Sequence, residues 1–135
     1  MADLKSFVAK WSPVVHSIMR IMIALLFMEH GAQKLFGIPV AMKGGTVALF
    51  SLMGLAGALE FYGGLLVLLG LFTRPVAFIL SGEMATAYFM AHAPMGFWPV
   101  LNQGELAVLY CFVYLYLAFA GGGLLSLDHV LRKID

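Results

Sequence analysis

The sequence predicts an all-α integral membrane protein, a bundle of four membrane-spanning helices with short interfacial helices at both termini. Hydrophobic residues make up 62% of the 135 residues and charged residues only 11%, a balance that leaves more apolar surface than a small water-soluble core can bury. The mean hydropathy is +0.96. The apolar residues also gather into four segments near the roughly 20 residues that a helix needs to cross a bilayer.

These predicted spans form a single domain and cover residues 13–36, 46–71, 75–92 and 104–120. The first span contains Arg20 and is followed by no small-residue cleavage site, so it is not read as a signal peptide. Pro75 suits the first turn of the third span, where a missing N–H is tolerated. Asn102 is expected to cap the fourth span, with Glu105 three residues on in capping-box spacing, and Gly121–Gly123 to end it.

Apolar residues at helical spacing near both ends predict the interfacial helices: Leu4, Phe7, Val8 and Trp11, and then Leu127, Val130, Leu131 and Ile134. Four spans place both termini on one side of the membrane. That side carries more of the basic residues close to span ends, namely Lys5, Lys10, Arg74, Arg132 and Lys133 against Lys34 and Lys43. The positive-inside rule therefore predicts cytoplasmic termini.

The charge pattern excludes a nucleic-acid partner, because the net charge is only +1 and the basic residues are scattered. Membrane lipid is the expected surrounding. Cys111 is the single cysteine of the chain and lies in the fourth span, where a thiol usually packs as a small hydrophobe.

Ionisable side chains inside the spans mark the candidate site, because charges in lipid are expensive and usually functional. Counting about 1.5 Å per residue places Arg20, Glu60 and Glu83 in an inner layer. We expect Arg20 and Glu60 to form an interhelical ion pair. Since one cation then faces two carboxylates, one of Glu60 and Glu83 is expected to be protonated or to hold another cation.

An outer layer is predicted from His30, Lys34, His92 and Glu105. Lys34 falls within roughly 40° of the Arg20 face, whereas Glu29 points about 180° away and is set aside. In an ideal helix His92 also lies about 180° from Glu83, so the two layers require a bend or two different interfaces.

Close helix packing is predicted around the second span, because Gly57, Glu60 and Gly64 fall on one side of it. The apolar link from Ala93 to Gln103 is expected to fold onto the outer surface. Its aromatic residues Phe97 and Trp98 either sit at the headgroup level or roof a lipophilic pocket beside the two histidines.

Several short motifs follow one another in a characteristic order along nearly the whole chain. They are Arg20, His30-Gly-Ala-Gln-Lys-Leu-Phe-Gly37, Glu60, the Gly63–Arg74 run ending in Thr-Arg, His92, Gly104-Glu105 and Gly123-Leu-Leu-Ser-Leu-Asp128. This set resembles the DoxX family of small four-helix membrane proteins. The resemblance implies a multi-pass protein of the prokaryotic inner membrane and a small subunit of a quinone-linked oxidoreductase, of the thiosulfate:quinone or quinol oxidase type.

The resemblance gives the polar residues candidate roles. Arg20, Glu60 and Glu83 become the candidate catalytic or proton-handling groups, and His30, Lys34, His92 and Glu105 the candidate cofactor-binding groups, with no metal site predicted. Paired histidines suit hydrogen bonds to a quinone oxygen, a proton relay or, if their rings are opposed, haem ligation.

The alternative is a non-enzymatic scaffold that anchors redox proteins or forms a homo-oligomer. In that case Arg20 and Glu60 only lock two helices, Glu105 is a helix cap and the histidines are structural.

Overall fold

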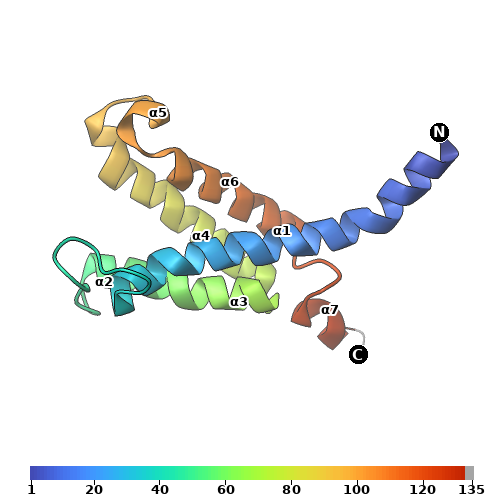
Figure 1. Cartoon of the computed structure of the whole chain (residues 1–135), viewed down its shortest axis with the longest axis horizontal. Coiled ribbons are helices and arrows are strands. Elements are labelled where there is room, and N and C mark those ends of the chain that lie inside the picture. Colours follow the sequence, from blue (N-terminus) through green and yellow to red (C-terminus); the bar gives the residue numbers. More distant parts are fainter. Residues whose placement is uncertain (133–135) are drawn as a thin grey trace.

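The computed structural model describes residues 1–132, and in this range every regular element is a helix (Figure 1). The all-α prediction is confirmed. The elements are α1 (Ala2–Phe36), α2 (Leu52–Ala58), the π-helical turn η1 (Leu59–Gly63), α3 (Gly64–Leu69), α4 (Thr73–Ala87), the π-helical turn η2 (Tyr88–His92), the 3₁₀ turn η3 (Ala93–Met95), α5 (Pro99–Asn102), α6 (Glu105–Ala120) and α7 (Leu127–Arg132). The predicted contributions of Lys133 and Ile134 lie outside the described residues.

The sequence predicts a separate interfacial helix at the N-terminus. In the structure this segment is instead the first part of α1. The helix continues through Pro13, whose carbonyl accepts a hydrogen bond of 3.1 Å from Ser17 Oγ. Proline removes one N–H donor, a local cost that a long apolar helix absorbs with a bend. Figure 1 shows the start of α1 projecting from the rest of the molecule as an arm. At its other end α1 stops at Gly37, which adopts φ 68°.

Two other helix starts differ from the prediction. The second apolar segment becomes helical at Leu52 rather than residue 46, because Ser51 Oγ accepts the Gly54 N–H at 3.0 Å and caps the helix there. The expected capping box at the fourth segment is wrong. Asn102 belongs to α5, and its Oδ1 accepts the Gly104 N–H at 2.9 Å, so Gly104 precedes α6 and Glu105 is left exposed.

The helices associate as two pairs. The α1 pair consists of α1 against the continuous segment α2–η1–α3, and the α4 pair consists of α4–η2 against α6. Backbones approach closely in the α1 pair: a Cβ added to Gly31 would lie 2.5 Å from the Phe61 nitrogen and 2.7 Å from the Gly57 carbonyl. In the α4 pair Ser81 Oγ donates to the Cys111 carbonyl at 2.7 Å. The predicted glycine-mediated packing of Gly57 and its neighbours is confirmed.

Aromatic side chains join the two pairs at the core. Phe27 of α1 packs against Tyr110 and Tyr114 of α6, with ring centroids 5.0 and 4.8 Å apart. Beyond this contact the pairs diverge toward the end that carries α2 and α5 (Figure 1). The divergence leaves an opening between them.

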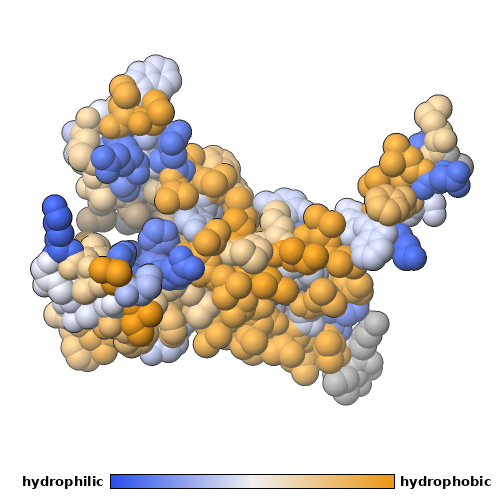
Figure 2. Space-filling model, viewed as in Figure 1, coloured by the Kyte–Doolittle hydropathy of each residue, from blue (hydrophilic) through white to orange (hydrophobic). Residues whose placement is uncertain are grey.

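The outer surface is largely apolar. Among the described residues, two helical segments, Asp3–Phe36 and Leu52–Leu69, are long and apolar enough to cross a membrane, and Glu105–Ala120 is a shorter apolar helix. Figure 2 shows hydrophobic residues over most of the visible helical body and hydrophilic residues on both sides of the opening. A surface of this kind suits lipid rather than water.

Candidate functional site: a charged cavity between two helix pairs

A cavity of about 740 Å³ occupies the opening between the α1 pair and the α4 pair. Most of its wall is apolar and is formed by residues such as Leu55, Ile79, Met84 and Leu106. Five ionisable residues predicted as site residues also line it: His30, Lys34, Glu60, Glu83 and His92. The structure thus brings together, in one place, groups that the sequence divided between two layers.

Lys34 and Glu60 form an ion pair across the α1 pair. Lys34 lies in the last turn of α1 and Glu60 in η1, and Nζ is 2.5 Å from Oε2, with a second contact to Oε1. The side chains are 16% and 4% exposed, so both are largely withdrawn from solvent. The predicted pairing of Glu60 with Arg20 is therefore wrong, because Lys34, the other cation on that face of α1, is the one in register with Glu60.

Arg20 lies outside the cavity and contacts main-chain oxygens. Its guanidinium donates to the carbonyls of Gly122 at 2.7 Å, Leu68 at 2.6 Å and Leu125 at 2.5 Å, and also to that of Val67. The side chain is fully buried. The Val67 and Leu68 carbonyls belong to the last turn of α3, whereas Gly122 and Leu125 lie in the segment after α6, so Arg20 ties that segment to the α1 pair.

Glu83 faces the same cavity from α4. Both of its carboxylate oxygens are buried, and neither has a hydrogen-bond partner among residues 1–132. Such a group usually has a functional explanation, because a buried acceptor without a donor is costly. Lys34 supplies the cation for Glu60, and the protonation of Glu83 stays a prediction.

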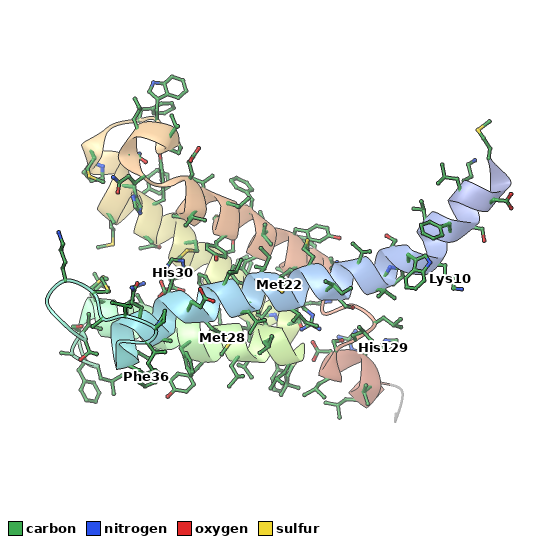
Figure 3. The ribbon with its side chains drawn as sticks, viewed as in Figure 1. Lys10, Met22, Met28, His30, Phe36 and His129 are labelled. Atoms are coloured by element: carbon green, nitrogen blue, oxygen red, sulfur yellow. The ribbon has the colours of Figure 1, made fainter. Side chains whose placement is uncertain are left out.

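The two histidines reach the cavity from opposite pairs. His30 packs edge-on against Tyr110 with a centroid distance of 6.1 Å, and Figure 3 shows it on the side of α1 that faces the α4 pair. His92 Nδ1 is 3.0 Å from the Asn102 carbonyl. Of the two alternatives left by the ideal-helix angle, a departure from the regular helix and not two different interfaces is what the structure shows, because Glu83 and His92 line one cavity. The π-helical turn η2 turns the chain through less than 100° per residue, which brings His92 round to the Glu83 side.

Other residues near the site differ from the sequence analysis. Glu105 is exposed and is not part of the cavity wall. Phe97 and Trp98 are 78% and 63% exposed and do not roof it, although Gln103 at the end of the same link does line it. Tyr110 lines the cavity but is not among the site residues predicted from the sequence. The available signal is the spacing of Tyr110 and Tyr114, one helical turn apart, which places both on the face of α6 that packs against Phe27. Within residues 1–132, no group of three His, Cys, Asp or Glu residues could hold a metal ion.

These features define a class: an all-helical membrane protein with an apolar cavity that contains a buried ion pair, a further carboxyl group and two imidazoles. A sequence model of the DoxX family matches residues 15–93. The chain belongs to the DoxX family, which is membrane-associated.

Two relatives match over most of their length. An "Uncharacterized protein" of Haemophilus influenzae is 46% identical over 128 residues, covering 92% of this chain and 96% of the relative. A Bacillus subtilis protein named "Putative oxidoreductase CatD" is 30% identical over 127 residues, covering 86% of each chain. No solved structure matches.

Proposed function

We propose that this protein is a four-span subunit of a quinone-linked oxidoreductase in a prokaryotic inner membrane, with both termini in the cytoplasm. The spans are α1, α2–η1–α3, α4–η2 and α6. Their lipid-facing positions carry large apolar residues such as Phe78 and Phe112, which are exposed in the isolated chain. The greater number of basic residues near span ends on the side of the termini supports the orientation.

The observation that carries the proposal is the convergence of the ionisable residues on one apolar cavity. Its volume of about 740 Å³ lies in the range of small-molecule sites, roughly 300–1,000 Å³. A flat, apolar ring with oxygens at its edge needs an apolar wall and a few polar groups at fixed positions, and this cavity has both. A bound quinone would supply chemistry in which two electrons and two protons are exchanged.

His92 is suited to hold an oxygen of such a ligand. Because a carbonyl can only accept, the contact with Asn102 assigns the proton to Nδ1 and leaves Nε2 as the nitrogen for a ligand. Neutral Nε2 accepts a hydrogen bond from a hydroxyl, and protonated Nε2 donates one to a carbonyl. His30, which Tyr110 holds edge-on, provides a second imidazole on the opposite wall.

Glu83 is the proposed proton-exchanging group. Its carboxyl oxygens lack protein partners in the described part of the chain, so this group can take up or release a proton without breaking an existing hydrogen bond. The Lys34–Glu60 pair beside it fixes the local charge. We propose that the electrons are exchanged with a partner redox subunit, and the oxidoreductase name of the Bacillus subtilis relative supports this association.

The test is quinone binding by the purified full-length protein. We expect quinone to be extracted with the wild-type protein, and a short-chain ubiquinone analogue to quench its tyrosine and tryptophan fluorescence. His30→Ala and His92→Ala should weaken this binding at least about tenfold, the effect of losing about 1.4 kcal/mol at a polar contact. Glu29→Gln is the matched control, since Glu29 lies beside His30 on α1 and, unlike His30, does not line the cavity.

Two other outcomes would replace the proposal. A Soret band that is lost in both histidine variants would identify haem instead of quinone. The scaffold function is favoured if the protein binds neither quinone nor haem, and if cells that express folded His30→Ala or His92→Ala protein respire normally. One observation supports the scaffold function: Arg20 donates its hydrogen bonds to backbone carbonyls, which is a structural role.

A further inference from the structure

A second pocket lies at the other end of the helical body, where α4 begins, α6 ends and α7 packs. Its volume is about 210 Å³. It is lined by the glycine run Gly121–Gly123 and by the side chains of Arg74, Asp128, His129 and Arg132. None of these residues lines the cavity between the helix pairs, so the pocket is independent of the proposed quinone site.

Asp128, the acidic residue of the pocket, already accepts hydrogen bonds from the backbone. Asp128 Oδ1 accepts the Phe72 N–H at 2.8 Å and Oδ2 accepts the Thr73 N–H at 2.9 Å, so the carboxylate caps the start of α4. These bonds leave the two guanidinium groups as the available charges. Arg74 uses one nitrogen, Nη1, for the Phe119 carbonyl and retains further donors for a ligand.

His129 provides an independent indication of a ligand. His129 is one of the residues that line this pocket. Its Nε2 atom is buried and has no hydrogen-bond partner in the described range. Figure 3 labels His129 on α7. A ring nitrogen without a partner, in a pocket with two arginines, suits an oxygen-rich anion, since an imidazole N–H and a guanidinium are both donors.

We propose that this pocket binds a phosphate group, and that its source is the headgroup of an anionic phospholipid. Guanidinium groups match phosphate geometry with paired donors, and the Arg74 guanidinium lies against Gly121, where an added Cβ would be 3.3 Å from its Nε. Exposed apolar side chains lie next to the lining residues: Phe119, Leu125 and Leu127 are their neighbours in the chain, and Phe72 donates its N–H to Asp128. These residues would contact acyl chains, which a free phosphate ion lacks, and basic pockets at helix ends are typical headgroup sites.

The experiment is native mass spectrometry of the full-length protein in detergent, titrated with phosphatidylglycerol, phosphatidylcholine or inorganic phosphate. We expect wild-type protein to bind phosphatidylglycerol at least about tenfold more tightly than phosphatidylcholine. Arg132→Gln should weaken binding of phosphatidylglycerol about fivefold and Arg74→Gln/Arg132→Gln about 25-fold, because each arginine near a headgroup contributes roughly a factor of five. Arg132 is exposed, so its single variant tests the pocket even if the double variant folds poorly.

The matched control is Lys5→Gln/Lys10→Gln, which removes two positive charges from the arm of α1 and should leave phosphatidylglycerol binding unchanged. Equal losses in the control and the arginine variants would overturn the proposal, because they would show attraction to net charge alone. Unchanged binding in Arg132→Gln and in a folded double variant would also overturn it. If inorganic phosphate binds with the same arginine dependence and phosphatidylglycerol does not, the phosphate pocket stands and the lipid source is overturned.

Discussion

Lys34 at the end of α1 and Glu60 in the π-helical turn η1 form an ion pair at the wall of the cavity between the helix pairs. Removing one partner leaves a largely buried charge without its counterion. We expect Lys34→Met or Glu60→Leu alone to lower the free energy of unfolding by about 3–5 kcal/mol, and the double variant to recover much of that loss. Unfolding titrations in mixed micelles, arranged as a double-mutant cycle, measure the coupling. Additive losses in the double variant would show that the two residues do not interact.

Glu83 is expected to show the opposite relation between stability and function. Since its buried oxygens lack partners in the described chain, Glu83→Leu removes a desolvated polar group and should raise the thermal midpoint, by the equivalent of about 1–3 kcal/mol. The same variant should lose binding of the quinone analogue. Thermal melts and fluorescence titrations on one preparation check both effects. A lower midpoint would mean that the carboxyl group contributes to the fold.

Arg20→Met should release the segment that follows α6. The variant leaves the Gly122, Leu68 and Leu125 carbonyls without their charged donor, a loss of at least about 3 kcal/mol for several buried hydrogen bonds. We expect faster hydrogen exchange at residues 121–132 and little change in the Lys34–Glu60 region. Lys10→Met, an exposed substitution on the same helix, is the control. Uniform loosening of the whole protein would argue against a local anchor.

Gly31 and Gly82 offer a matched pair of substitutions. A Cβ at Gly31 would meet the Phe61 nitrogen at 2.5 Å, whereas nothing lies within 4 Å of one at Gly82. Gly31→Ala should destabilise the protein by about 1–3 kcal/mol, because the α1 pair must separate. Gly82→Ala, in the interior of α4, should be neutral or stabilising by up to about 1 kcal/mol. Thermal melts of the two variants should move apart, and equal midpoints would show that the α1 pair tolerates the added methyl group.

Asp128 should make part of the stability depend on pH. Burial raises the pKa of this carboxyl, but hydrogen bonds from the Thr73 and Phe72 amides, together with Arg132, outweigh burial and hold its pKa below the ordinary 3.8. A lowered folded-state pKa means that the stabilisation is complete above the unfolded-state pKa and is lost as the pH falls through the folded-state value.

The check is a series of melts at decreasing pH. Wild-type protein should lose stability below about pH 4 more steeply than Asp128→Asn, while Asp128→Asn should be less stable near neutral pH by about 1 kcal/mol. Asp3→Asn, on the exposed arm of α1, should follow the wild-type curve. Parallel curves for wild type and Asp128→Asn would contradict the capping role.

Much of the fold is local information and could be predicted. Two of the predicted apolar runs, Pro75 in the first turn of α4 and the glycines on one side of α2–η1–α3 depend on neighbours in the chain, and the structure confirms them. In the sequence the Thr-Arg and Ser-Leu-Asp motifs have a meaning only as parts of the family pattern. The structure gives their reason, since Asp128 caps the helix that begins at Thr73.

The sequence by itself determined that the protein is helical and apolar, and that a few ionisable residues lie inside apolar helices. Only the tertiary structure decided which of them meet. Arg20 and Lys34 lie near one face of α1, and the choice between them as partner for Glu60 depends on how far the antiparallel helices slide along each other. That sliding is set by the contact of Gly31 with Gly57 and Phe61, distant in sequence, and the π-helical turn η2 sets the direction of His92. Neither is encoded in the 3.6-residue period of an ideal helix.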